Sequence, residues 1–370
     1  MTEIDLDALR EAVSRRDDDA VDRARERLDT LVKPLGALGR LEDLGAWLAG
    51  AQGTCPPRPL ADVRLVVLAG DHGVAARGVS AYPAEVTAAM VRTFVSGQAG
   101  VSVLARQHGV HVRVLDLGVD SDDLPAEVTQ LKVRRSSGSI DREDALSYDE
   151  VREAFAVGMR VADDEVDSGA DLLVAGDMGI GNSTIAAALV GATLGLGPLD
   201  VVGTGTGIDD TAWAHKVEAL RDALYRADAH RPRSLRLTPL DLLRTVGSAD
   251  TAAMTGFLVQ AAARRTPVLL DGLVSCACAL VAREIAEDAA DWWVAAHRST
   301  EPAQHRALEA LGLEPLVDLG MRLGEGSGAL VALPLLRSAQ ALLAEMGTLA
   351  DLGLAASPEP DAPVLDDEAT

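Results

Sequence analysis

The feature that most constrains how this chain can fold is a set of short, continuous apolar runs. VRLVVLAG at 63–70 is typical of a strand that is covered on both faces of a sheet. Similar runs follow at 110–119, 171–176, 266–272 and 291–297. Helical patterns lie between or after these runs, near 84–107, 150–167, 183–194, 210–228, 250–264, 274–288 and 302–312. This alternation predicts an α/β fold with a doubly wound, mostly parallel sheet.

Polar residues stand where these runs end. Asp71 and His72 follow the first run, and Asp177, Asp271 and His297 occupy the corresponding places later in the chain. Ligands of doubly wound sheets bind outside the carboxyl ends of the strands. We therefore expect the functional site at this edge of the sheet. For His72, considered as an isolated histidine, we expect a structural role.

The two ends of the chain are expected to form a small helical domain together. Residues 4–30 and 31–50 have helical patterns, and TCPPRP at 54–59 is a linker. The last helix, near 327–346, is apolar on all faces and is expected to pack on the N-terminal helices. The expected divisions are a small helical domain from 1–60 plus 331–356, a catalytic domain over 61–330 and a disordered acidic tail over 357–370.

Composition limits the partners. The net charge is −23, which argues against nucleic acid and anionic membrane as general partners. The three cysteines, Cys55, Cys276 and Cys278, lack the spacing of a zinc site, so we expect reduced thiols in a cytoplasmic protein. The start of the chain is acidic, unlike a signal peptide, and no metal or cofactor is expected.

Two glycine-rich loops are candidates for binding a phosphate. GDMGIGNST at 176–184 places Gly179 and Gly181 just before a helix that Asn182, Ser183 and Thr184 open. Exposed N–H groups at a helix start attract phosphate, although a tight turn with a Ser/Thr cap is the alternative.

The second loop, GTGTG at 203–207, contains Gly203 and Gly205 and precedes Lys216. Lys216 is a candidate counter-charge for the phosphate, and a solvated surface lysine is the alternative. Neither loop is a Walker motif. The paired acids with a downstream Thr-Gly loop, which enzymes of phosphoribosyl pyrophosphate use, are also missing.

Glu325 stands alone among glycines in LGMRLGEGSGAL at 319–330. Glycine lets another molecule approach the backbone closely. A carboxylate there is either a loop acid in water or a charge that is directed at a substrate.

Several segments together resemble one family, the nicotinate-nucleotide:dimethylbenzimidazole phosphoribosyltransferases. The matching stretches, in family order, are KPLGALGRLE (33–42), AGDHGVAARGVSAYPAEVT (69–87), GDMGIGNST (176–184), GTGTGIDD with Lys216, VLLDG (268–272), AHRSTEPAQH (296–305) and LGLEPLVDLGMRLGEGSGA (311–329). The resemblance implies a Rossmann-like sheet, a small helical domain built from both chain ends, and a homodimer. It also implies transfer of the phosphoribosyl group from nicotinate mononucleotide to 5,6-dimethylbenzimidazole.

The resemblance also implies roles for particular residues. Glu325 matches the catalytic base, and Asp177 stands where the family usually has a second glutamate. Lys216 matches the lysine that holds the phosphate. The expected base-binding residues are Tyr82, Met90, Leu323 and Glu325. Other departures from the family pattern occur at Leu35, Ala37 and Gln304, and we expect them to adjust rather than abolish activity.

Two alternatives stay open at this point. The same chemistry could use another acceptor, such as benzimidazole, adenine or a phenol. The chain could also be a nucleotide-binding relative that lost turnover, which the intact RLGEGSGA segment disfavours.

Overall fold

The computed structural model describes residues 4–230 and 237–354, and these residues form two compact units. The larger unit contains residues 4–15 together with the described part of 60–334. The smaller unit contains residues 16–59 and 335–354. The expected tail, 357–370, lies outside the described residues.

The larger unit is built on a five-stranded parallel sheet with strand order β2-β1-β3-β4-β5. Its strands are β1 (Val63–Gly70), β2 (His111–Gly118), β3 (Leu172–Met178), β4 (Val268–Leu270) and β5 (Trp293–Ala295). Each apolar run of the sequence overlaps one of these strands. A strand that is covered on both faces is apolar along its length, which is why the runs are continuous. The predicted doubly wound α/β fold is confirmed.

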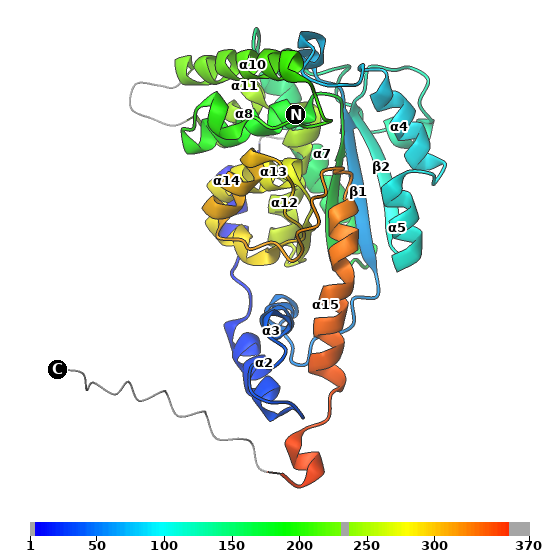
Figure 1. Ribbon diagram of the computed structural model, residues 1–370, viewed down its shortest axis with the longest axis vertical. Helices are drawn as coiled ribbons and strands as arrows, with labels where there is room; N and C mark the ends of the chain where they lie inside the picture. Colours follow the sequence, from blue (N-terminus) through cyan, green and yellow to red (C-terminus); the bar gives the residue numbers. More distant parts are fainter. Residues whose placement is uncertain (1–3, 231–236, 355–370) are drawn as a thin grey trace, which may run out of the picture. The chain divides into compact units, whose positions relative to one another are not determined.

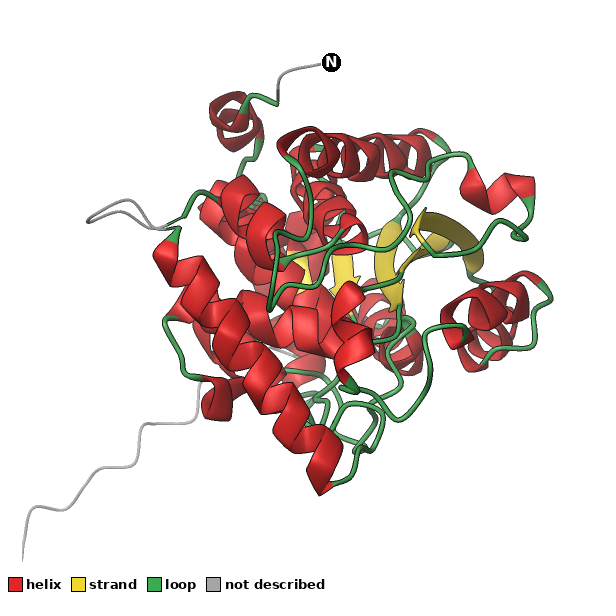
Figure 2. Ribbon diagram, turned by 90° about the horizontal axis from the view of Figure 1, so that it is seen from above, coloured by secondary structure: helices red, strands yellow, loops and turns green. Residues whose placement is uncertain are grey.

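Helices cover both faces of this sheet (Figures 1 and 2). In Figure 1, α4 and α5 lie on one side of β1 and β2, and α7 lies on the other side. The helices of the larger unit are α1 (Leu6–Ala12), α4 (Val86–Val95), α5 (Gly100–His108), α6 (Ala126–Thr129), α7 (Tyr148–Asp167), α8 (Asn182–Leu194), α9 (Pro198–Val201), α10 (Asp210–Ala229), α11 (Pro239–Val246), α12 (Ala249–Ala263), α13 (Leu273–Ile285), α14 (Pro302–Leu311), the first half of α15 (Ser327–Glu345), and the short 3-10 helices η1 (Gly73–Arg77) and η2 (Glu287–Trp292).

The structure differs from the sequence prediction at several helical segments, among them α11, which was not predicted. The single helix that was expected over 84–107 is two helices, α4 and α5, which residues 96–99 separate. Residues 4–15 belong to the larger unit and not, as expected, with the rest of the N-terminal helices. Two hydrogen bonds tie this segment to the larger unit: Trp292 Nε1 donates to the Ser14 carbonyl (2.8 Å), and Arg10 Nε donates to the Ile285 carbonyl (3.1 Å).

The smaller unit contains α2 (Asp18–Thr30), α3 (Arg40–Gln52), the second half of α15 and the 3-10 helix η3 (Leu349–Leu352). Its core consists of Val21, Ala24, Leu28, Leu31, Ala46, Ala49 and Leu343. Leu343 lies in α15, so the last helix packs on the N-terminal helices as expected. Arg27 strengthens this packing by donating from Nε to the Leu343 carbonyl (2.7 Å).

Helix α15 is long and apolar enough to cross a membrane, and it is the single such helix in the described part of the chain. The core helix of a folded domain passes the same test. Just over half of its most apolar window, 56%, is buried within the structure. Length and hydropathy are therefore weak evidence for a membrane span here.

Candidate active site

The carboxyl edge of the sheet gathers the polar residues that follow the strands. Asp71, His72, Asp177, Asp271 and His297 are all buried there. His297 Nε2 lies 3.8 Å from Asp271 Oδ1. Within residues 4–230 and 237–354, no group of three or more His, Cys, Asp and Glu side chains could hold a metal ion. The cluster is a set of three buried aspartates and two buried histidines.

Asp271 fixes the turn that carries Glu325. Its Oδ2 accepts from the Gly326 N–H (3.0 Å), and its Oδ1 accepts from the Ala329 N–H (2.8 Å). These donors lie at the start of α15, where a negative charge stabilises exposed N–H groups. Glu325 has φ +66°, a conformation that is uncommon for residues other than glycine. The anchored turn holds this conformation in place.

The Glu325 side chain is buried, with 4% of its surface exposed. Burial, followed by repulsion from Asp271, raises the pKa of this carboxyl from 4.5 to about 7, against a hydrogen bond from the Val101 N–H. Its Oε2 has no hydrogen-bond partner within the described residues. The reading of Glu325 as a loop acid in water is therefore wrong. A carboxyl whose pKa is near neutrality is suited to accepting a proton.

Asp177 lies at the end of β3 beside the Glu325 turn. A Cβ at Gly324 would lie 3.3 Å from Asp177 Oδ2, so this turn passes directly over the carboxyl. Burial, followed by repulsion from Asp271, Asp250 and Glu325, raises the Asp177 pKa well above its ordinary value. Asn182 opposes this shift by donating from Nδ2 to Oδ2 (2.7 Å). Asp177 and Glu325 are thus neighbouring acids, each of which makes ionisation of the other less favourable.

A cavity of about 500 Å³ opens beside these acids. It is walled by Tyr82, Asp177, Asn182, Ser183, Gly205, Thr206, Gly272, Leu273, Val274, His297, Ser299, Glu301, Arg322, Leu323 and Gly324. Both glycine-rich loops and the Glu325 turn contribute to this wall. The turn contributes Leu323 and Gly324, and Glu325 itself is not among the lining residues. A volume of this size is in the range of small-molecule sites.

Lys216 lies behind one end of the cavity and is fully buried on α10. Its Nζ donates to Ser183 Oγ (2.9 Å), and Ser183 faces the cavity. Burial lowers the Lys216 pKa, and attraction to Glu301 opposes that shift. The alternative of a solvated surface lysine is excluded. A buried ammonium with one hydroxyl partner among the described residues has donors left for an anion.

The remaining residues of the first glycine-rich loop have different surroundings. Gly181, with φ +95°, precedes α8 as its N-cap, and Asn182 begins the helix without a side-chain cap. Thr184 is fully buried and does not line the cavity, in contrast to Asn182 and Ser183. Gly179 packs against the end of β1, where an added Cβ would lie 2.1 Å from the Gly70 carbonyl oxygen. Of the three polar residues that open α8, two therefore face a ligand and the third does not.

The expected base-binding residues are only partly together. Tyr82 and Leu323 line the cavity and are 56% and 57% exposed, so both lie at its rim. Thr206 Oγ1 holds the Tyr82 loop by accepting from the Ala81 N–H (2.9 Å). Met90 is half-buried on α4 and is not among the residues that line the cavity.

Sequence reasoning missed two charged residues of the cavity wall. Arg322 donates from Nη1 to the Gly205 carbonyl (2.6 Å), and Glu301 accepts at Oε1 from the Gly205 N–H (2.8 Å). Both lie within segments that resemble the family, but neither has a local signal beyond its charge. Gln304, which departs from the family pattern, bridges the Ser299 N–H (2.6 Å) and the His297 carbonyl (3.0 Å) and so supports this part of the wall.

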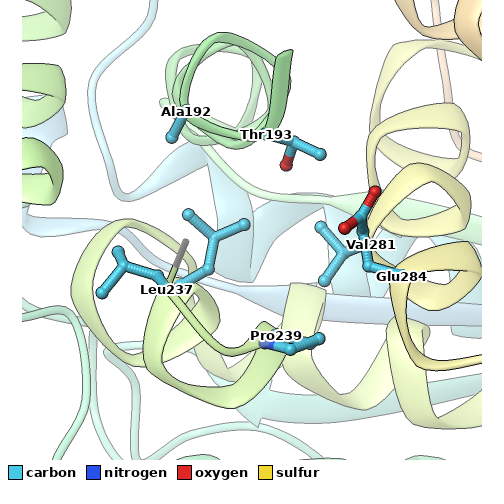
Figure 3. Close-up of a pocket in the computed structure, with 7 residues that line it drawn as sticks. Ala192, Thr193, Leu237, Pro239, Val281 and Glu284 are labelled. Atoms are coloured by element: carbon cyan, nitrogen blue, oxygen red, sulfur yellow. The ribbon is translucent and has the colours of Figure 1, made fainter. Parts of the chain in front are cut away.

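A second cavity lies away from the acids, between α8, the start of α11 and α13 (Figure 3). Thr193, Leu237 and Val281 are among its lining residues. Its volume is about 30 Å³, which is room for one or two water molecules but not for a nucleotide. We place the chemistry in the cavity at the carboxyl edge because Asp177 lines that cavity and Ser183, the partner of Lys216, faces it.

Comparison with known proteins gives the class of this fold and site. A family model described as Phosphoribosyltransferase matches residues 13–354. The match covers both units of the structure, including the Glu325 turn and both glycine-rich loops. The protein is a phosphoribosyltransferase.

Individual relatives show which phosphoribosyltransferase family the chain belongs to. The nicotinate-nucleotide--dimethylbenzimidazole phosphoribosyltransferase of Mycobacterium avium (strain 104) is 55% identical over 92% of this chain and 97% of its own. That of Mycobacterium tuberculosis (strain ATCC 25618 / H37Rv) is also 55% identical, over 92% of this chain and 93% of its own. The crystal structure of CobT from Thermus thermophilus superposes with a TM-score of 0.86 at 40% identity, over 92% of this chain and 100% of its own. The chain belongs to the nicotinate-nucleotide--dimethylbenzimidazole phosphoribosyltransferase family.

Proposed function

We propose that this protein transfers the 5-phosphoribosyl group of nicotinate mononucleotide to 5,6-dimethylbenzimidazole, giving α-ribazole 5′-phosphate and nicotinate. The observation that carries the proposal is the environment of Glu325. It is a buried carboxyl with a pKa of about 7 and an unpartnered oxygen, beside a cavity whose other end has a buried lysine. The relatives that match over nine-tenths of the chain are named for this reaction.

The substrate supplies its own leaving group in this reaction. One ring nitrogen of the benzimidazole attacks C1′ of the ribose, and the bond from C1′ to the pyridinium nitrogen breaks. The electron pair of that bond leaves with nicotinate, whose ring becomes neutral at nitrogen. Attack from the face opposite the leaving group inverts the β configuration to α.

The proton on the other ring nitrogen of the benzimidazole must leave as positive charge builds on that ring. We assign Glu325 as the base that accepts it. Proton transfer to a positioned side chain contributes about 10²–10⁴-fold in rate. The remaining acceleration comes from holding the two rings and the ribose in one geometry.

Asp177 and Lys216 act on the two ends of the phosphoribosyl group in this proposal. Positive charge at C1′ lowers the raised pKa of Asp177 and favours its carboxylate as the transition state is approached. The Lys216 ammonium, with the Ser183 hydroxyl, binds the 5′-phosphate. Gly205 leaves room for these two groups, because a Cβ there would lie 2.8 Å from Ser183 Oγ and 3.2 Å from Lys216 Nζ, whereas Gly203 leaves room for the Glu301 carboxyl.

Product analysis tests the proposal directly. The purified protein is incubated with nicotinate mononucleotide and an equimolar mixture of 5,6-dimethylbenzimidazole, benzimidazole, adenine and a phenol, and the products are separated by chromatography. We expect nicotinate and α-ribazole 5′-phosphate in equal amounts. A different dominant glycoside would replace the proposed acceptor, and nicotinate release no faster than in protein-free buffer would contradict the proposal.

Lys216→Ala is expected to raise the KM for nicotinate mononucleotide by about 10- to 100-fold, because a charge-assisted contact to the phosphate is lost. The effect on kcat should be smaller, since the lysine is remote from C1′ in the proposed arrangement. Lys216→Met, which keeps most of the buried volume, serves as the companion variant. An unchanged KM in both folded variants would remove Lys216 from the phosphate site.

We also propose a cytoplasmic homodimer. The support is the family resemblance together with three free cysteines, of which Cys276 and Cys278 are buried. Light scattering during size-exclusion chromatography would measure the mass of the protein in solution and so test the dimer. A mass of one chain across the micromolar range would contradict a stable dimer.

A further inference from the structure

The Glu301 carboxyl is the one acidic group of the cavity wall that the proposed mechanism leaves without a role, apart from supporting the loops. It is 5% exposed and precedes α14 as its N-cap, yet its side chain does not cap that helix. The carboxyl reaches across to the second glycine-rich loop, where Oε1 accepts from the Gly205 N–H. Its Oε2 has no hydrogen-bond partner within the described residues.

The surroundings of Glu301 hold this carboxyl in place. The Ser299 hydroxyl accepts from the Glu301 N–H (3.3 Å), which fixes the backbone before α14. On the opposite side, Gly203 leaves space for the carboxyl, because a Cβ there would lie 2.0 Å from Oε2. A carboxylate has about four acceptor positions, and one of them is used here. The side chain is therefore fixed, buried and still able to accept hydrogen bonds from a ligand.

The position of Glu301 limits what that ligand group can be. Ser183 and Gly205 belong to the same wall, and Lys216 lies behind them with its ammonium attracted to Glu301. A phosphate oxygen would be repelled by the carboxylate, whereas a hydroxyl donates to it. Asp177 and Gly324 line the same cavity, so a pentose 5-phosphate between the acids and the lysine would bring its ring hydroxyls into this wall.

We propose that Glu301 accepts a hydrogen bond from a ribose hydroxyl of the nucleotide and so selects ribonucleotides over deoxyribonucleotides. The inference rests on the proposed function, because it takes nicotinate mononucleotide as the bound nucleotide. A carboxylate that is already buried makes this selection strong, since a ligand without the hydroxyl leaves the acceptor unpaired in a dry site. If Glu301 serves only to balance the charge of Lys216, no such selection arises from it.

Binding measurements with ribonucleotide and deoxyribonucleotide ligands separate these roles. The dissociation constants of nicotinate mononucleotide and of its 2′-deoxy and 3′-deoxy analogues are measured by calorimetry without benzimidazole, for the wild type, Glu301→Ala and Glu301→Gln. The wild type should bind at least one deoxy analogue about 10- to 100-fold more weakly than the ribonucleotide. In Glu301→Ala that ratio should fall to within about threefold of unity, and in Glu301→Gln it should be intermediate. Glu309→Gln, an exposed change on α14, the helix that Glu301 precedes, should leave the ratio unchanged.

The outcomes are distinct. Full discrimination retained in Glu301→Ala would overturn the inference, as would equal binding of all three ligands by the wild type. Should Glu301→Ala fail to fold, the same comparison is made with Glu301→Gln, and discrimination equal to that of the wild type would count against the inference. Nucleotide binding without formation of α-ribazole 5′-phosphate would contradict the proposed function alone, because these binding ratios do not depend on turnover.

Discussion

Glu325→Gln is expected to lower kcat by at least two orders of magnitude while leaving the KM for nicotinate mononucleotide close to that of the wild type. The amide has nearly the shape of the carboxyl but cannot accept the benzimidazole proton, and a positioned base is worth about 10²–10⁴-fold. Steady-state kinetics with both substrates would measure the effect. Glu345→Gln, an exposed change at the far end of α15, the helix that follows the Glu325 turn, is the matched control. A near-normal kcat in Glu325→Gln would remove the proposed base.

The same variant has a signature in the pH dependence of the rate. The wild-type kcat/KM should fall about tenfold per pH unit below pH 7, because the base is then protonated and its pKa is about 7. In Glu325→Gln the residual activity should lack this limb. If the limb persists unchanged in the variant, it belongs to another group.

In Glu325→Gln, the free energy of unfolding should rise above that of the wild type at high pH, although the activity falls. The pKa of Glu325 is raised from 4.5 to about 7 on folding, so the folded protein holds this proton more tightly than the unfolded chain. The resulting stabilisation is fully present below pH 4.5 and is lost as the pH rises through 7. At pH 8, Glu325→Gln should therefore be more stable than the wild type by roughly 3 kcal/mol at most, as measured by urea unfolding. Near pH 4.5 the difference should be small.

The strands and the edge that they form could be predicted from the sequence. A parallel strand between two helical layers must be apolar along its length, and VRLVVLAG at 63–70 becomes β1 with the same bounds. The runs at 266–272 and 291–297 shrink to the three-residue strands β4 and β5. Buried residues beside a strand are apolar whether or not they form the hydrogen bonds of the sheet. The apolar pattern alone therefore cannot locate the ends of a strand.

The glycines around Glu325 could also be interpreted from the sequence, because a side chain is excluded wherever another group lies close to the backbone. A Cβ at Gly326 would lie 2.5 Å from the Leu65 side chain, and one at Gly328 would lie 2.0 Å from the His297 ring. The pattern shows that something approaches the backbone, but not which group. The identity of the neighbours depends on β1 and the end of β5, which are distant in sequence.

Glu301 shows where sequence reasoning fails. The stretch STEP at 299–302 reads as an ordinary helix start with proline in the first turn. The partner of its carboxyl is the Gly205 N–H, which is 96 residues earlier in the chain. No local sequence pattern predicts a contact between residues so far apart in the chain. A buried acceptor of this kind can be found only from the structure of the cavity wall.

Gly176→Ala is expected to inactivate the enzyme without touching any reacting group. Gly176 lies in β3 opposite Val67 of β1, and its added Cβ would lie 2.3 Å from the Glu325 carbonyl oxygen and 2.7 Å from the Glu325 carbonyl carbon. Both contacts are backbone, and β3 is held by strands on either side, so the Glu325 turn must move by about 1 Å. A displacement of that size can cost about 100-fold in rate. Overpacking should also lower the free energy of unfolding by about 1–3 kcal/mol.

Gly118→Ala provides the matched control for this effect. Gly118 ends β2 in the same sheet, and a Cβ there would lie 3.6 Å from the Ala249 Cβ, an ordinary contact. Its kcat should stay within about threefold of the wild type, because the Glu325 turn is not disturbed. The double variant Gly176→Ala with Glu325→Gln should lose no more activity than Glu325→Gln alone, since both changes act on the same base. Fully additive losses would show instead that Gly176 supports catalysis by a route other than the position of Glu325.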